Sequence, residues 1–117
     1  MMIADIISNS KTPIHTIASG MTYSGGFLIL ISGHKRFATK HSSIMWHQVS
    51  STLYGKLDGL YEDYDMVRTF QNNIDNFILS KTNIERSDLD GVYKRKKDWY
   101  MSPDEALVFG IIDEVIQ

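Results

Sequence analysis

The first residue that could do chemistry is Ser24, in the stretch TYSGG that precedes the apolar run FLILI. A serine between a strand and a helix lies near the unpaired N–H groups and the positive dipole end of that helix. The flanking glycines leave room for a substrate carbonyl, and the backbone N–H of Gly25 could bind a developing oxyanion. The stretch is related to the nucleophile elbow G-x-S-x-G but lacks its first glycine. Taken alone, it favours a serine that only caps the helix.

A serine nucleophile needs a general base, and the chain has four histidines. His47 ends the apolar segment SIMWHQ, so a strand would hold its imidazole at the rim of a sheet. A purely structural histidine is the alternative at this position. His15 falls in a predicted strand, at a core or edge position, and His34 and His41 fall in a basic turn where we expect them to be solvated.

The third member of a hydrolytic triad is a carboxylate that fixes the tautomer of the imidazole. Asp98 stands between a basic run and an aromatic pair in the segment KRKKDWY. Charge balance for the basic run is its alternative role. Asp88, Asp90 and Asp113 are the rival candidates, and we expect a structural role for Asp113 beside the last strand.

Length and composition limit the classes of protein to which the chain can belong. A chain of 117 residues forms one domain or part of one. Its net charge of −2 gives no overall attraction to nucleic acid or an anionic membrane, and the basic run over 94–97 is expected to be a solvated face. The longest apolar run, 27–31, is too short to span a bilayer. With no cysteine and no signal-peptide pattern, a cytoplasmic setting is expected.

The order of predicted elements indicates an α/β domain. In the first half these are a helix over 1–9, a strand over 14–19, a helix over 24–32 and strands over 36–39 and 43–48. A loop of small residues is expected to follow. The alternation of strands and helices predicts a layered α/β architecture.

The second half is dominated by a long helix predicted over 57–79. At 1.5 Å per residue it would be about 33 Å long, so we expect part of it to project from the core or to pack on another subunit. A short helix and a polar loop are expected over 80–101. The signature SPDE begins a last helix that Gly110 ends, and 111–116 is expected to form a strand or an extended tail.

Three of these segments resemble the Clp protease proteolytic subunit. TIASGMTYSGGFLILISG is similar to the family stretch around the nucleophile, and RFATKHSSIMWHQ to the segment R-[YF]…M-I-H-Q that carries the base. KKDWYMSPDEALVFGIIDEVI is similar to the ending R-D-x-[YF]-[ML]-S-x-x-E-A, which carries the acid. The order Ser24, His47, Asp98 and the intervals between them are close to those of the family. The resemblance covers nearly the whole chain, is weakest over 49–93, and implies a Clp protease/crotonase-like layered fold of repeated β-α units.

The resemblance implies a serine endopeptidase that acts on unfolded polypeptides without a cofactor or a metal. Ser24 would attack the peptide carbonyl, and His47 would pass the serine proton to the leaving amine. Asp98 would orient His47, and the N–H of Gly25 would be one oxyanion donor. The helix over 57–79 resembles the family's handle, through which two seven-membered rings stack into a chamber served by a hexameric ATPase unfoldase.

Several features depart from the family pattern. Gly25 stands where the family usually has methionine, and the loop KTNIERSDLDG lacks the usual T-G-Q segment. The upstream strands and the S-P-G-G turn, which supplies a second oxyanion donor, have no counterpart. We therefore expect residues 1–117 to form a single partial peptidase domain whose N-terminal part is missing. It would be an incomplete gene product, a partner of a separately encoded N-terminal half, or a shortened relative of cellular or viral origin.

The sequence is also compatible with two other functions. The missing oxyanion segment favours a non-catalytic subunit that acts only in oligomer assembly, because losing one such donor typically costs about 10²–10³ in rate. A relative in the wider crotonase-type superfamily would bind acyl-thioesters on the same architecture. That second alternative leaves the order of Ser24, His47 and Asp98 unexplained.

Overall fold

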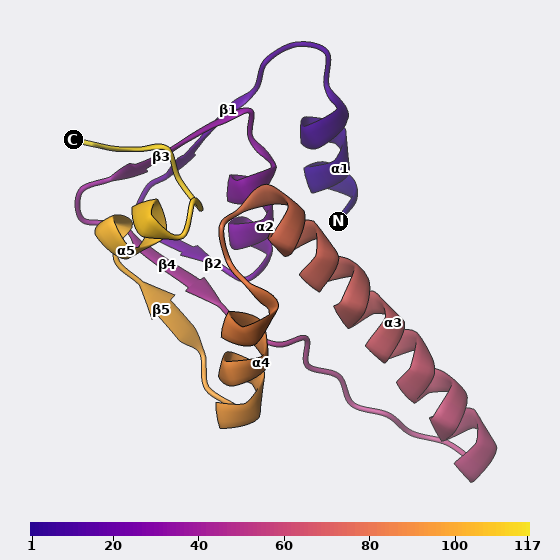
Figure 1. Ribbon diagram of the computed structural model, residues 1–117. Coiled ribbons are helices and arrows are strands. Elements are labelled where there is room, and N and C mark those ends of the chain that lie inside the picture. The colour runs from indigo at the N-terminus through magenta and orange to yellow at the C-terminus, as the bar shows by residue number, and fades with distance from the viewer.

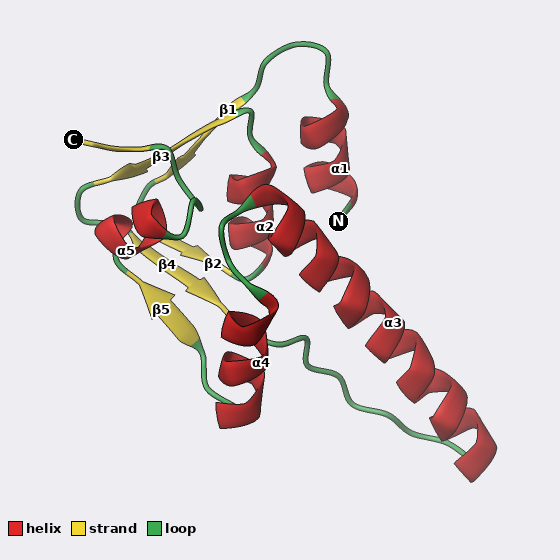
Figure 2. Ribbon diagram, in the orientation of Figure 1, coloured by secondary structure: helices red, strands yellow, loops and turns green.

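The computed structural model describes residues 1–117 as a mixed α/β domain (Figures 1 and 2). In chain order the elements are α1 (Met2–Asn9), β1 (His15–Ala18), β2 (Met21–Tyr23), α2 (Gly25–Ser32), β3 (Lys35–Thr39), β4 (Ser43–Trp46), α3 (Leu57–Lys81), α4 (Arg86–Arg95), β5 (Trp99–Met101), α5 (Pro103–Val108) and β6 (Glu114–Ile116). None of the helices is both long enough and apolar enough to cross a membrane.

The strands form two three-stranded sheets. In the first, β3 is central and pairs in parallel with β1 and β6. In the second, β4 is central, parallel to β2 and antiparallel to β5. Parallel neighbours need a crossover connection, and α2 lies in the crossovers of both β1–β3 and β2–β4. The two sheets therefore share one buried helix.

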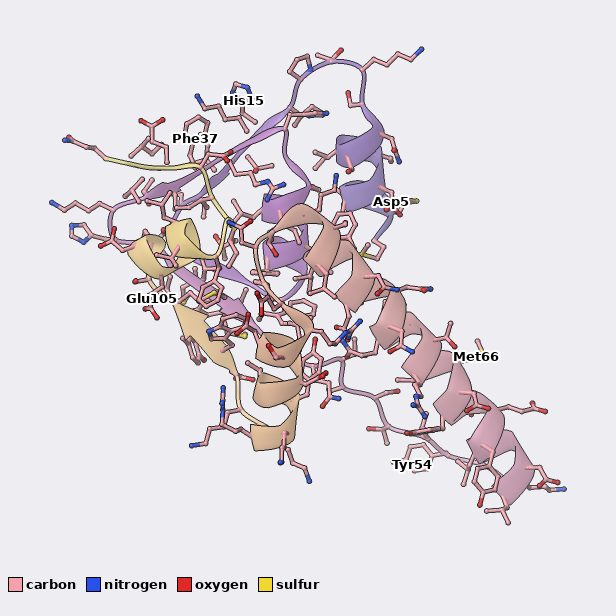
Figure 3. All side chains as sticks on the ribbon, viewed as in Figure 1. Asp5, His15, Phe37, Tyr54, Met66 and Glu105 are labelled. Atoms are coloured by element: carbon pink, nitrogen blue, oxygen red, sulfur yellow. The ribbon has the colours of Figure 1, made fainter.

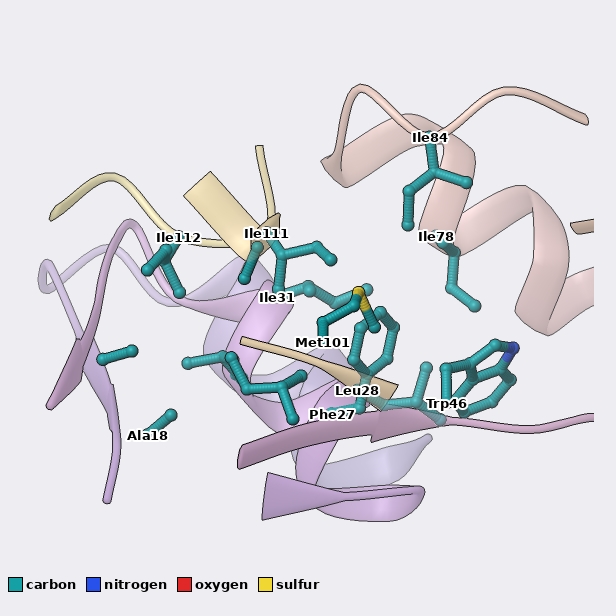
Figure 4. Packing of buried hydrophobic residues seen from close by; sticks show 14 of the residues in the cluster. Ala18, Phe27, Leu28, Ile31, Trp46, Ile78, Ile84, Met101, Ile111 and Ile112 are labelled. Carbon is teal, nitrogen blue, oxygen red and sulfur yellow. The ribbon is translucent and has the colours of Figure 1, made fainter. Parts of the chain in front are cut away.

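Helix α2 is the centre of the core. Its sequence GGFLILIS is apolar almost all round, a pattern that indicates a buried helix, and Phe27 and Ile31 are fully buried. Figure 4 shows these side chains packed with Trp46 from β4 and with Ile78 from α3. The Trp46 and Phe27 ring centroids lie 5.3 Å apart. The predicted helix over 24–32 is confirmed, and it packs against β2 and β4 of the second sheet.

Helix α3 projects from the body of the domain, as the sequence predicts. Its buried residues, Ile74, Asp75 and Ile78, all lie in its last third. The rest extends away from the sheets, with the loop after β4 running beside it (Figure 1). Figure 3 shows Tyr54 and Met66 far from the sheets at this end of the molecule, and both side chains are exposed.

Some predicted details are wrong. The strands β2 and β5 were not expected, because segments of three residues are too short to show an alternating pattern. The strand predicted over 43–48 ends at Trp46, and the long helix continues two residues past 79. The helix predicted over 1–9 is confirmed, and its apolar residues Met2, Ile3 and Ile6 are exposed.

Arg36 and Asp113 attach the C-terminal segment to the first sheet. The Asp113 carboxylate accepts the backbone N–H of Arg36 at 2.8 Å, and the Arg36 carbonyl accepts the backbone N–H of Asp113. The Arg36 guanidinium donates to the carbonyls of Gly33, Lys81 and Gly110. Burial lowers the pKa of Arg36, and the charge of Asp113 opposes that effect. The structural role expected for Asp113 is confirmed.

Gly110 is a position where only glycine fits. Its φ is +68°, and a Cβ there would lie 2.8 Å from the side-chain nitrogen of Asn83 and 3.2 Å from the Asn83 backbone nitrogen. We therefore expect Gly110→Ala to lower the free energy of unfolding by about 1–3 kcal/mol. Urea denaturation measures this change.

Gly91→Ala is the matched control. Gly91 lies inside α4, and its Cβ would meet only the end of the Arg95 side chain at 3.7 Å. This replacement should raise the free energy of unfolding by about 0.5–1 kcal/mol. Equal effects of the two replacements would show that the turn at Gly110 is not constrained as described.

Candidate active site

The three candidate side chains come from adjoining strand ends of the second sheet. Ser24 directly follows β2, His47 directly follows β4, and Asp98 directly precedes β5. The register pairs Tyr23 with Met45 on one side of β4 and Trp46 with Trp99 on the other. Continued by one residue, the antiparallel register sets His47 opposite Asp98. Since β4 is central, the histidine follows the strand that separates the serine from the aspartate.

Ser24 occupies a strained turn between β2 and α2. Its φ of 57° and ψ of −108° make it one of two non-glycine residues with positive φ, the other being Lys96. Its N–H donates to the Met45 carbonyl at 3.0 Å, which ties the turn to β4. The Ser24 hydroxyl makes no cap hydrogen bond to α2, so the capping interpretation is wrong. Such strain costs about 1–3 kcal/mol and concentrates at functional sites.

Gly25 provides an open approach to the start of α2. As the first residue of the helix, its N–H has no acceptor within the helix, and it lies near the positive end of the helix dipole. A Cβ built on Gly25 would meet no atom within 4 Å. An anionic oxygen could therefore approach this N–H without a steric obstacle.

His47 is half-buried and is held by its own segment of chain. Its Nδ1 lies 2.5 Å from the carbonyl oxygen of Gln48, and its ring stacks on Trp46 with centroids 6.0 Å apart. A carbonyl oxygen can only accept, so this contact places a proton on Nδ1, and in the neutral imidazole Nε2 is then the acceptor. That is the tautomer a general base acting through Nε2 needs.

Asp98 follows the end of α4. The helix stops at Lys96, whose φ of 54° is the left-handed conformation usual just after a helix, and the chain then turns into β5. His47 and Asp98 both line an open cavity of about 590 Å³, together with Ser50, Tyr93 and the lysines 96 and 97. Ser24 does not line this cavity.

The structure thus brings the three candidates to one edge of the sheet without joining them. No hydrogen bond links the side chains of Ser24, His47 and Asp98. Instead of a triad partner, the Gln48 carbonyl accepts the hydrogen bond from Nδ1 of His47. A hydrogen-bonded triad would require the imidazole to leave this carbonyl. No group of three or more histidine, aspartate or glutamate side chains is arranged to hold a metal ion.

The rival histidines do not reach this edge. His15 lies exposed on β1, in the other sheet, beside the ring of Phe37 (Figure 3). His34 and His41 are exposed as expected, and Nδ1 of His34 accepts the N–H of Ile14 at 3.0 Å.

The rival aspartates on α4 also lie outside the candidate site. Asp88 accepts the N–H of Glu85 in the capping box of α4, and Asp90 is exposed on the same helix. Tyr93 is a cavity residue that sequence reasoning missed. Its hydroxyl accepts a hydrogen bond from the indole N–H of Trp46, the last residue of β4, at 3.0 Å. A tyrosine within a polar helical segment gives no sign in the sequence of such a contact.

The sequence model of the Clp protease family matches residues 1–117. The chain belongs to the Clp protease family. An ATP-dependent Clp protease proteolytic subunit of Deinococcus radiodurans is 32% identical over 118 aligned positions, which cover 99% of this chain. ATP-dependent Clp protease proteolytic subunit 1 from Prochlorococcus marinus subsp. pastoris is 31% identical over 97% of the chain, and the one from strain NATL2A is 34% identical over 97%.

This Clp-family chain spans little more than half of those relatives. The aligned part is 57% of the Deinococcus protein and 58% of each Prochlorococcus protein. The resemblance inferred from the three sequence segments is confirmed, as is the mixed α/β fold class. Relatives named as proteolytic subunits indicate a protease-type function for the family to which the chain belongs.

The backbone strain at Ser24 has a measurable consequence for stability. Glycine adopts a positive φ without the steric cost that alanine bears. The free energy of unfolding, measured by urea denaturation, should therefore be about 1 kcal/mol higher for Ser24→Gly than for Ser24→Ala. The same pair of replacements at Ser51, an exposed loop residue without positive φ, should differ by less than about 0.5 kcal/mol. An alanine variant as stable as the glycine variant at position 24 would contradict the strain.

Proposed function

We propose that the chain is the catalytic part of a Clp-type serine endopeptidase, with Ser24 as nucleophile, His47 as general base and Asp98 as the carboxylate that orients the base. The observation that carries the proposal is the meeting of β2, β4 and β5, whose ends carry these residue types in this order. The strained turn at Ser24 and the membership of a protease family support it.

In the proposed reaction, His47 first rotates away from the Gln48 carbonyl, so that its Nδ1–H donates a hydrogen bond to the Asp98 carboxylate. Nε2 of His47 then takes the proton of Ser24 Oγ as this oxygen attacks the substrate carbonyl carbon. The negative charge that develops on the carbonyl oxygen is stabilised by the N–H of Gly25 and by the dipole of α2. His47 returns the proton to the leaving amine, and water hydrolyses the acyl-enzyme by the same steps in reverse.

We further propose that the substrates are unfolded polypeptides, delivered by an ATPase unfoldase to a chamber of stacked rings. The printed name of the relatives, ATP-dependent Clp protease proteolytic subunit, supports this part of the proposal. The projecting α3 would serve as the ring contact, because it carries apolar side chains that are exposed in the single chain. These are Leu57, Tyr61, Tyr64, Met66 and Phe70.

A non-catalytic subunit is the second candidate function. One observation favours it, namely the engagement of His47 with the Gln48 carbonyl rather than with Asp98. In such a subunit the fold and the α3 contact would be used for assembly alone. Hydrolysis of peptides by the chain, lost in His47→Ala, would exclude this candidate.

Labelling with a fluorophosphonate probe tests the serine assignment, because the probe reacts only with an activated serine. We expect the probe to attach to Ser24, the label to be absent in Ser24→Ala, and the labelling rate to fall about 10⁴-fold in Asp98→Asn. Mass spectrometry of the labelled peptide identifies the serine.

Ser50 supplies the matched control, since it lines the cavity that holds His47 and Asp98. Ser50→Ala should keep the label. A label that depends on Ser50 and survives Ser24→Ala would overturn the assignment of Ser24.

A further inference from the structure

A buried carboxylate on α3 is the centre of a hydrogen-bond network. The side chain of Asp75 is buried, and its carboxylate accepts hydrogen bonds from Tyr93 Oη at 2.6 Å and from Gln71 Nε2 at 2.8 Å. Arg86 Nη1 lies 2.9 Å from its other oxygen and neutralises the charge. A buried carboxylate needs such partners, because an unpaired buried charge is strongly destabilising.

The network reaches the chain on both sides of His47. On one side, the Trp46 indole N–H donates to Tyr93 Oη at 3.0 Å. On the other, the Val49 backbone N–H donates to Gln71 Oε1 at 2.7 Å. The candidate base therefore sits in a four-residue segment whose two ends are bonded to side chains that themselves bind Asp75.

The Tyr93 hydroxyl uses all of its hydrogen-bonding capacity in this arrangement. The Tyr93 hydroxyl donates to Asp75 and accepts from Trp46 and from Gln71 Nε2, the last at 3.1 Å. A hydroxyl has one donor and two acceptor sites, so all three are occupied. Burial, and then the hydrogen bond to Asp75, raise the pKa of Tyr93, so the hydroxyl keeps its proton throughout the neutral range.

We propose that Asp75, Gln71 and Tyr93 are positioning residues for His47. They fix the path of the chain from the end of β4 into the following loop, and with it the place from which the imidazole rotates toward Ser24. The inference rests on the proposed function only in taking His47 as the general base. The 46–49 segment also packs against apolar residues of α3 and α4, and the hydrogen bonds of Trp46 to Tyr93 and of Val49 to Gln71 add directional links to the same two helices.

Two variants of the 117-residue chain test the proposal, with two readouts each. Tyr93→Phe removes one hydroxyl, and Gln71→Ala releases the Val49 N–H. Hydrogen exchange of the Val49 amide and the NMR signal of the His47 ring report position without requiring activity. The inactivation constants for the fluorophosphonate probe report the consequence for Ser24.

We expect the Val49 amide to exchange at least tenfold faster in Gln71→Ala, and the His47 ring signal to shift in both variants. The maximal rate of inactivation should fall roughly tenfold to a hundredfold, because small displacements of a catalytic group have effects of this size, while the half-saturating probe concentration stays the same. Tyr54→Phe and Asn72→Ala, both at exposed positions, should leave every readout unchanged.

The outcomes separate this inference from the proposed function. If the folded variants keep the wild-type Val49 exchange and His47 signal, the positioning role is wrong, whatever the probe does. If these signals change as expected but wild-type Ser24 never reacts with the probe, the positioning role stands and the peptidase assignment is overturned.

Discussion

The pairing of β4 on both of its edges is the constraint on which the candidate site depends. A central strand must satisfy backbone groups on two sides, and β4 does so with β2 in parallel and with β5 in the antiparallel sense. Segments distant in the sequence thereby end at one edge of a sheet. A slip of one residue in either register would turn every side chain of the shifted strand to the opposite face. The burial of Ile44 and Trp46 against α2 resists such a slip.

The same element that anchors the core also creates the special environment at Ser24. Helix α2 must begin immediately after β2, so the chain reverses at a single residue, and that residue takes a positive φ. The turn exposes the first N–H groups of α2 with no side chain at Gly25 to cover them. Packing of the apolar face of α2 compensates for the local strain.

Much of the fold could be predicted because its signals are local. The helices over 24–32 and 57–79, and the capping box at Ser102, follow from hydrophobic spacing and cap chemistry. The strands β2 and β5 could not be predicted, since each has three residues and is defined by its pairing with β4 rather than by its own pattern. The hydrogen-bond network of Asp75 and Tyr93 could not be predicted for a similar reason. Polar residues on two helices reveal a shared partner only once tertiary packing joins those helices.

The central claim is that Ser24, His47 and Asp98 act as one unit at the end of β4. A crystal structure of the chain with a phosphonate bound to Ser24 measures this most directly. We expect His47 Nε2 within about 2.6–3.2 Å of Ser24 Oγ or the phosphonyl oxygen, with Asp98 rather than the Gln48 carbonyl at Nδ1. A phosphonylated Ser24 with His47 still bonded to Gln48 and far from the adduct would contradict the claim.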